Sequence, residues 1–208
     1  MTALTITEMQ PCFPGFEQVN RYWDKHRQCF VAKILPGEFY VTRHSELIGT
    51  VLGSCVSACI RDKLLGLGGV NHFMLPQNNR GTTDLDGSAA RYGCFAMEQM
   101  INAILKFGGN RKRLEAKLVG GGKIITSMGD VGRQNIEFAR NYLAVEGIAT
   151  LAEDLGGDRP RKLLYNPITG VLKVKKLNSF HNNTLVDREV HYRDQLQEQS
   201  LESDVELF

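Results

Sequence analysis

The sequence lacks the features that mark several large classes of protein. Its 25 Lys and Arg residues nearly balance its 23 Asp and Glu residues, and a net charge of +2 gives no reason to expect nucleic-acid binding. No apolar run approaches the ~20 residues that a membrane-spanning helix requires. The first residues, MTALTITEMQPCF, contain no basic segment followed by an apolar one, so they do not predict a secretory signal. These absences predict a cytoplasmic protein with no membrane span and no nucleic-acid partner.

Cysteine and histidine are present, but not in the spacings that form disulfide frameworks or metal sites. The five cysteines are an odd number without regular spacing, which is typical of free thiols in a reducing compartment. Cys55 and Cys59 form C-x-x-x-C, which is neither the redox C-x-x-C nor half of a zinc site, and we expect Cys59 in the core. No H-E-x-x-H pattern occurs, and the glycine-rich 120–123 lacks the spacing of a phosphate-binding loop. We therefore expect no metal, nucleotide or other cofactor.

The length and composition favour one domain with extensions at both ends. The chain has 208 residues, of which 42% are hydrophobic and 23% charged, as in an ordinary globular protein. Residues 1–28 are weakly patterned but hold large aromatic side chains, which predicts an arm that packs at least partly on the body. Residues 29–177 carry the strand and helix signals of a single domain. From 178 to 208 the core signal is lost and acidic residues accumulate, which predicts a disordered or loosely helical acidic tail.

Periodicity predicts many short strands and two main helices. Apolar residues at helical spacing favour helices over 92–107 and 132–145, each followed by glycine. The polar segment 77–88 is long enough to form a loop over a site. Strands are expected at 30–35, 39–42, 47–52, 56–60, 67–70, 115–119, 148–152, 162–166 and 171–175, the last two as a hairpin. This order of elements predicts an α+β fold rather than a regularly alternating parallel sheet.

The residues best suited to catalysis lie in 49–76, GTVLGSCVSACIRDKLLGLGGVNHFMLP. Cys55 comes just before the strand expected at 56–60, and His72 follows the strand expected at 67–70. A polar turn at 61–63 separates the two strands, so we expect them to be neighbours. Neighbouring strands can bring a thiol and an imidazole within reach of each other, and such a pair can produce a thiolate nucleophile.

Each of these residues also has a structural interpretation. A cysteine in an apolar strand is more often a small buried side chain, and a single histidine on a strand is more often structural. The small Gly53-Ser54 step before Cys55 favours a catalytic role for this cysteine, because it allows a sharp turn and the close approach of a substrate. An imidazolium at His72 would lower the thiol pKa from about 8.5 by about two units, and would later protonate a leaving amine. Thr50 is the candidate to orient the ring, through its hydroxyl or its backbone carbonyl, although alone it reads as an ordinary strand residue.

A tight glycine-rich turn is the expected structure of residues 120–122. Glycine allows such a turn to approach the strands closely. Its backbone N–H groups are candidates to hold an oxyanion beside the thiol.

These motifs together resemble those of the CheD family of bacterial chemotaxis proteins. The matching segments, in chain order, are LGSCV (52–56), GVNHFMLP (69–76), VGGG (119–122), AEDLGG (152–157) and NPITG (166–170). The likeness extends from about residue 39 to about residue 175, and includes neither terminal segment. Several separate segments in the same order make this resemblance more specific than a lone Gly-Ser-Cys.

The resemblance implies a Cys-His-Thr catalytic set, with Cys55 as nucleophile, His72 as general acid and base, and Thr50 as the orienting residue. It also implies a layered α/β/β sandwich with mixed or antiparallel sheets, similar to the deamidase domain of cytotoxic necrotizing factor toxins. The implied reaction is the hydrolysis of glutamine side chains to glutamate on methyl-accepting chemotaxis receptors, through a thioester. The family also implies a CheC-type phosphatase as a possible partner, and some members are assigned receptor methylesterase activity.

Two other functions stay open on the sequence. A non-catalytic chemotaxis adaptor could bind receptors or a CheC-type phosphatase, with the aromatic residues of 1–28 as its contact surface. A thiol peptidase would need the same nucleophile as an amidohydrolase, so the motif alone does not separate these two enzymes.

Overall fold

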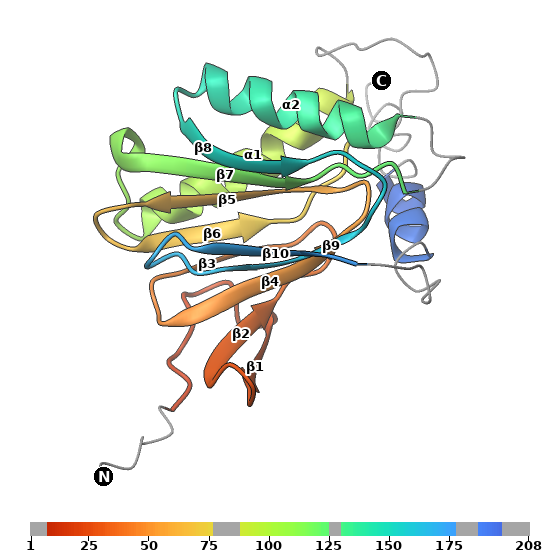
Figure 1. Cartoon of the computed structure of the whole chain (residues 1–208). Helices are drawn as coiled ribbons and strands as arrows, with labels where there is room; N and C mark the ends of the chain where they lie inside the picture. The colour runs from red at the N-terminus through yellow and green to blue at the C-terminus, as the bar shows by residue number, and fades with distance from the viewer. Residues whose placement is uncertain (1–7, 77–87, 125–129, 178–186, 197–208) are drawn as a thin grey trace, which may run out of the picture.

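The two β-sheets of the protein pack face to face, with helices on the outer side of the second sheet (Figure 1). The computed structural model describes residues 8–76, 88–124, 130–177 and 187–196. Within these residues the fold is α+β, as the sequence predicted, and it has two five-stranded sheets and three α-helices, one more helix than the two predicted. The layers therefore follow the order helix, sheet, sheet.

The first sheet is mixed and has the strand order β1-β2-β4-β9-β10. Strands β2 and β4 run parallel, and the other neighbours run antiparallel. Its strands are β1 (Asn20–Asp24), β2 (Cys29–Lys33), β4 (Glu46–Leu52), β9 (Arg161–Tyr165) and β10 (Leu172–Lys176). The hairpin of β9 and β10 confirms the prediction made for residues 162–175.

The second sheet is the middle layer and has the strand order β3-β6-β5-β7-β8. Only β7 and β8 run parallel. Its strands are β3 (Phe39–Thr42), β6 (Leu67–Asn71), β5 (Val56–Asp62), β7 (Leu114–Gly120) and β8 (Ala149–Leu155). Every residue of the central strand β5 except Arg61 is buried, because helices cover one face of this strand and the first sheet covers the other.

Two long helices cover the outer face of the second sheet. Helix α1 (Ser88–Lys106) lies over β3, β5 and β6, and helix α2 (Val131–Val145) lies over β5, β7 and β8. Both helices were predicted, although α1 begins four residues earlier than its apolar pattern indicated. The loop predicted at 77–88 falls outside the described residues, apart from the first residue of α1.

The aromatic residues near the N-terminus pack on the body. The Phe13 ring stacks on Phe107 with 3.9 Å between centroids, and Phe16 makes edge contacts with Phe39 and Tyr40. Strand β1, which the sequence did not predict, adds to the edge of the first sheet beside β2. The rings of Phe13 and Phe16 are therefore engaged in the fold, whereas Tyr22 on β1 is 41% exposed.

Residues 187–196 form a third helix, called the C-terminal helix from here on. The sequence predicted no core contribution after residue 178, and this was wrong for the C-terminal helix. Glu189, Tyr192 and Leu196 are 1%, 8% and 3% exposed. Only these three of its ten residues are buried, and the others are exposed or partly exposed. Because most of the helix is polar, its sequence resembles that of a disordered tail. The division of the chain into arm, domain and tail stays a prediction.

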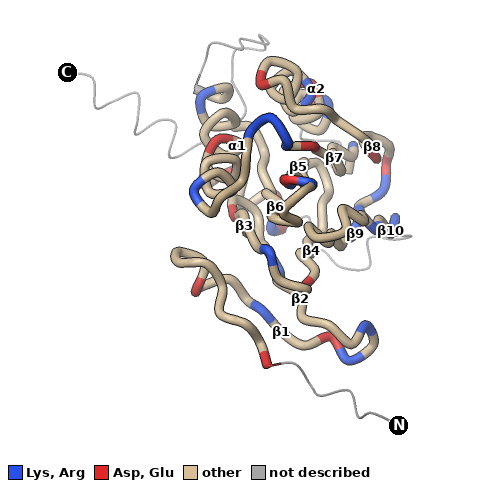
Figure 2. Tube along the Cα trace, turned by 90° about the vertical axis from the view of Figure 1, so that its left-hand side faces the viewer, with Lys and Arg blue, Asp and Glu red and all other residues tan. Residues whose placement is uncertain are grey.

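Charged residues of both signs are distributed over many elements of the described chain (Figure 2). Ion pairs such as Arg140 with Glu153 and Arg61 with Glu115 join them across neighbouring elements. Across the four described ranges, no helix has both the length and the apolar character that a bilayer crossing demands.

Candidate active site

Cys55 lies where the chain passes from one sheet to the other. Strand β4 of the first sheet ends at Leu52, and β5 of the second sheet begins at Val56. The three residues between them, Gly53, Ser54 and Cys55, form the crossover. A crossover of this kind leaves the backbone polar groups outside both ladders, so each needs a partner of its own.

All three carbonyl groups of this crossover are held from one side. The donors come from the glycine-rich turn after β7 and from helix α2. The pairs are Gly122 N to Gly53 O at 2.8 Å, Asn135 Nδ2 to Ser54 O at 2.9 Å, and Gly121 N to Cys55 O at 2.7 Å. The backbone N–H groups of the same three residues, Gly53, Ser54 and Cys55, all point toward a second site. This set of N–H groups is called the N–H cradle from here on.

The glycine-rich turn at 120–122 shapes the cradle but does not supply the oxyanion donors suggested by the sequence. The N–H groups of Gly121 and Gly122 are already used to hold carbonyls of the crossover. Gly120 has φ of +118°, and a Cβ there would lie 2.2 Å from the Cys55 carbonyl oxygen. The turn therefore requires glycine because of its close approach to the backbone of Cys55.

His72 follows β6 and is positioned by backbone bonds on both sides. Its N–H donates to Glu38 O at 2.9 Å, and its carbonyl accepts from Gly37 N at 2.8 Å. A single antiparallel bridge between Val56 and Phe73 joins the segment of His72 to that of Cys55. The ring is 1% exposed.

Thr50 determines which nitrogen of the His72 ring carries the hydrogen. The Thr50 hydroxyl donates to Ile34 O at 2.9 Å and lies 2.8 Å from Nδ1 of His72. Because the one hydroxyl hydrogen is directed at Ile34, Nδ1–H of His72 donates to Thr50 Oγ1. Nε2 is then the unprotonated nitrogen. It is buried and has no hydrogen-bond partner among the described residues.

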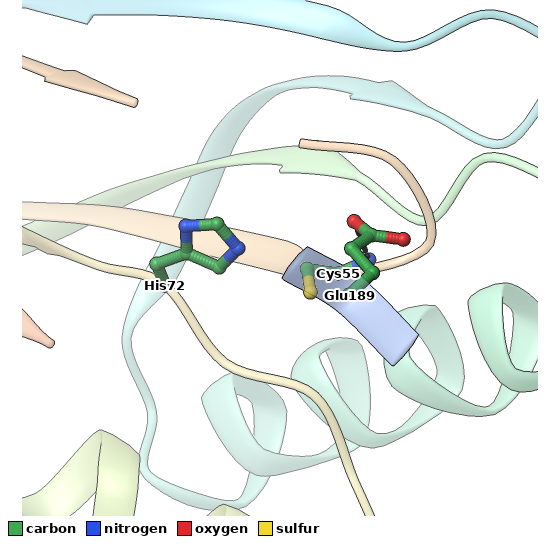
Figure 3. Close-up of side chains that lie close together, drawn as sticks. All are labelled: Cys55, His72 and Glu189. Carbon is green, nitrogen blue, oxygen red and sulfur yellow. Dashed lines mark hydrogen bonds between the residues drawn. The ribbon is translucent and has the colours of Figure 1, made fainter. Parts of the chain in front are cut away.

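The free nitrogen of His72 lies on the side of Cys55 and Glu189 (Figure 3). The Cys55 sulfur, a ring nitrogen of His72 and a carboxylate oxygen of Glu189 all lie within 4.8 Å of one another. The structure thus brings together Cys55, His72 and Thr50, which the sequence singled out, and Thr50 contacts the other nitrogen of the His72 ring. It also adds Glu189, which the sequence did not predict.

Burial keeps both the thiol and the imidazole neutral in this structure. It raises the pKa of the Cys55 thiol well above its ordinary value, and the neighbouring Glu189 carboxylate raises that pKa further. Burial lowers the pKa of His72 to about 3. The predicted thiolate held by an imidazolium was therefore wrong for this state of the protein, because the sequence showed neither the depth of the pair nor its anionic neighbour.

Glu189 of the C-terminal helix occupies the N–H cradle. Its Oε1 accepts from Gly53 N at 2.7 Å and, more weakly, from Cys55 N at 3.4 Å. Its Oε2 accepts from the N–H of Ser54 at 2.9 Å and from the Ser54 hydroxyl at 2.7 Å. A Cβ at Gly53 would lie within 2.7 Å of both oxygens, so glycine is what leaves the cradle open. The sulfur of Cys55 is 0% exposed beneath this contact.

The same three side chains could be considered as a metal site. Among the residues that the structure describes, Cys55, His72 and Glu189 are the one group with enough donor atoms at suitable spacing. Both oxygens of Glu189 are, however, already bound by N–H and O–H donors. The positive ends of these groups repel a cation and attract an anion. The arrangement is therefore an anion-binding cradle beside a thiol.

His72 also lines a pocket of about 240 Å³. Thr50, His72 and Arg188 contribute to its wall. Two further cations, Lys33 and Lys162, line it as well. Three cations therefore line this pocket, which gives it a positive character.

Asn135 of helix α2 joins the segments that carry Cys55 and His72. Its side-chain Nδ2 donates to Ser54 O at 2.9 Å, and its Oδ1 accepts from Leu75 N at 2.8 Å. The residue is 0% exposed. The sequence gives no sign of this role, because a single polar residue on a helix with a weak apolar stripe carries no distinctive signal.

Replacing Asn135 by alanine should lower the free energy of unfolding by roughly 1–3 kcal/mol, because two buried backbone groups lose their partners. Urea unfolding followed by circular dichroism measures the change. Asn102→Ala on the exposed face of α1 is the matched control, and should change stability by less than about 0.5 kcal/mol. Equal effects of both substitutions would show that Asn135 does not clamp the site.

Comparison with known proteins identifies the family. A family model described as CheD chemotactic sensory transduction matches residues 74–176. A protein of Hahella chejuensis is 52% identical over 196 residues, which cover 94% of this chain and 93% of that protein. The chain belongs to the CheD family. The resemblance inferred from the sequence motifs is thereby confirmed.

Other CheD relatives match nearly the whole chain. A protein of Halorhodospira halophila is 52% identical over 95% of this chain and 93% of its own length. A protein of Saccharophagus degradans is 44% identical over 100% of this chain and 98% of its own length. Each of the three relatives is named "Probable chemoreceptor glutamine deamidase CheD". A solved structure of a Neisseria meningitidis protein matches 58% of this chain with 12% identity, and its TM-score of 0.34 is too low to support an argument.

Proposed function

We propose that this CheD-family protein is a protein-glutamine glutaminase, a hydrolase that converts glutamine side chains of methyl-accepting chemotaxis receptors to glutamate. The observation that carries the proposal is the meeting of three features at one point. These are the thiol of Cys55, the unprotonated Nε2 of His72 and a set of N–H groups that hold a carboxylate. Relatives about half identical to this chain are named chemoreceptor glutamine deamidases, which supports the same chemistry.

The first half of the reaction forms a thioester. Cys55 gives its proton to Nε2 of His72 as its sulfur attacks the carboxamide carbon, so no stable thiolate is needed beforehand. The carbonyl oxygen becomes an oxyanion that the N–H groups of Gly53 and Cys55 stabilise. The His72 imidazolium then protonates the amide nitrogen, the carbon–nitrogen bond breaks, and ammonia leaves.

The second half hydrolyses the thioester. Neutral His72 takes a proton from a water molecule as the water attacks the same carbon, and the cradle again holds the oxyanion. The carbon–sulfur bond breaks, the sulfur takes the proton from His72, and the product is a glutamate side chain. The net reaction consumes one water, releases one ammonia and regenerates the enzyme.

Thr50 acts in this mechanism as a positioning residue. By accepting the Nδ1–H of His72, it holds the ring with Nε2 toward the sulfur. A neutral hydroxyl stabilises an imidazolium less than a carboxylate would, so this pair suits a histidine that is charged only transiently.

Mass spectrometry of a purified receptor cytoplasmic fragment tests the proposal. Incubation with the protein should raise the mass by about 1 Da at each converted glutamine, because an NH₂ group is replaced by a heavier OH group. Both the wild type and Glu189→Ala should be assayed, because Glu189 fills the cradle. Cleavage of the fragment would indicate a thiol peptidase, and binding without any change of mass in either assay would indicate an adaptor.

Several finer predictions belong to the same proposal. The protein is expected to act in the cytoplasm, where the modified part of such receptors would lie. A CheC-type phosphatase stays a predicted partner. The likeness of the layered fold to the deamidase domain of cytotoxic necrotizing factor toxins is also proposed, on the basis that a thiol and a histidine meet at the edge of two packed sheets.

A further inference from the structure

Glu189 is a buried acid that the mechanism does not use. It is 1% exposed, and four donors from Gly53, Ser54 and Cys55 converge on its two oxygens. A buried carboxylate with this many donors is strongly held, because N–H and O–H groups replace its hydration. Its partners are separated from it by 134 to 136 residues in the sequence, so the contact is made by the fold rather than by a local turn.

The C-terminal helix is seated on the body by contacts besides Glu189. The hydroxyl of Tyr192 is hydrogen-bonded to that of Tyr92 on α1, and the Tyr192 ring packs on Gly37. Leu196, one turn further, is 3% exposed within the hydrophobic core. Residues at positions i, i+3 and i+7 of one helix therefore face the body together.

The two oxygens of Glu189 are held as the two oxygens of a product carboxylate would be. Oε1, bound by the N–H groups of Gly53 and Cys55, lies where a substrate carbonyl oxygen would become the oxyanion. Oε2 accepts from both the N–H and the hydroxyl of Ser54, so its position suits an oxygen atom such as that of the attacking water or of the product. Glutamate is the product of the proposed reaction, so the chain presents its own site with a side chain of product structure.

We propose that the C-terminal helix is an internal product analogue that occupies the substrate site and inhibits the enzyme. The inference rests on the proposed function and adds a means by which that site is regulated. The side chain of Glu189 reaches the cradle from a helix that lies along the body.

Occupancy of the cradle by Glu189 also explains why the sulfur of Cys55 is inaccessible to solvent. The helix covers the thiol, and the carboxylate contributes to the raised pKa of Cys55. A neutral glutamine in the same place would remove the negative charge and bring the carboxamide carbon to the sulfur. A substrate must therefore displace the C-terminal helix before reaction, which makes the helix a competitive inhibitor within the chain.

The sharpest test is Glu189→Gln in the full-length protein. The glutamine introduced at position 189 is delivered to the cradle by the native helix, so the enzyme should convert it back to glutamate, with a gain of about 1 Da in the intact mass. Cys55→Ser in the same background should block the conversion. A protein that converts receptor glutamine but leaves the introduced glutamine unchanged would overturn the inference while leaving the proposed function in place.

Alkylation of the thiol tests occupancy without relying on catalysis. Iodoacetamide should modify Cys55 about tenfold faster or more in Glu189→Ala than in the wild type, because the thiol becomes accessible and more acidic. Asp194→Ala, an exposed acid on the same helix, is the matched control and should react like the wild type. Peptide mapping separates Cys55 from the other cysteines, and circular dichroism confirms that each variant folds.

The two readouts separate the possible failures. Equal alkylation of Cys55 in the wild type and in Glu189→Ala would overturn the inference whatever the enzyme does. Faster alkylation in Glu189→Ala, with no deamidation of either the receptor or the introduced glutamine, would support occupancy and overturn the proposed reaction. Faster alkylation together with self-conversion supports both.

Discussion

Replacing Cys55 by alanine should abolish the deamidation of receptor glutamine, with a loss in rate of at least about 10³-fold, because no other group can form the thioester. The cradle and His72 stay in place in this variant, so receptor binding should persist. The measurement is the rate of mass gain on the receptor fragment under single-turnover conditions.

Cys59→Ala is the matched control for this loss. Cys59 is also a fully buried thiol, four residues further along the chain on β5, and it lies opposite Val70 and Lys117 in the sheet. Its replacement should cost about 1 kcal/mol of stability through the small cavity, and leave the rate unchanged at a temperature where the variant is folded. If both variants lose activity equally, the thiol of Cys55 has no special role.

The pairing of Cys55 with His72 could be predicted because it depends on neighbouring strands. The short turn at 63–66, predicted at 61–63, makes β5 and β6 adjacent, and their ends bring the two residues to one edge of the sheet. Thr50 could be predicted for a similar reason, since it lies on the strand that leads to the crossover. These contacts depend on alternation and on short connections, both of which are visible in a sequence.

The occupant of the cradle could not be predicted from the same patterns. Glu189 is 136 residues from Gly53, and the helix that carries it has only a short buried stripe among exposed polar residues. A segment of this composition is typical of a disordered tail. Its order comes from a few tertiary contacts with the body, of which the cradle is one, and such contacts leave no periodic signal.

The protonation states of Cys55 and His72 also could not be predicted from the sequence. A Cys-His pair suggests a thiolate and an imidazolium, but the outcome depends on how deeply the pair is buried and on which charges surround it. Here the pair lies at the junction of two packed sheets and faces a carboxylate. If the C-terminal helix occupies the substrate site as proposed, departure of that carboxylate is the step that prepares the sulfur to react.

Replacing His72 by glutamine should lower the deamidation rate by about 10²- to 10⁴-fold, because the amide cannot accept the proton of the thiol or return it to the leaving nitrogen. His44→Gln is the matched control. That ring bonds Pro11 O and lies near Phe13, away from the thiol, so its loss should leave the rate unchanged.

The same substitution should also change the dependence of stability on pH. The pKa of His72 is about 3 in the folded protein, against 6.5 as its ordinary value. Between these values the unfolded chain binds a proton that the folded chain does not, so His72 stabilises the fold fully above pH 6.5. That contribution falls by about 1.4 kcal/mol for each pH unit below 6.5. Urea unfolding at pH 7.5, 6 and 5 should therefore show a steeper loss for the wild type than for His72→Gln. Parallel profiles for the two proteins would mean that the ring is not buried in its neutral form, and that the proton transfer proposed for the first step starts from a different state.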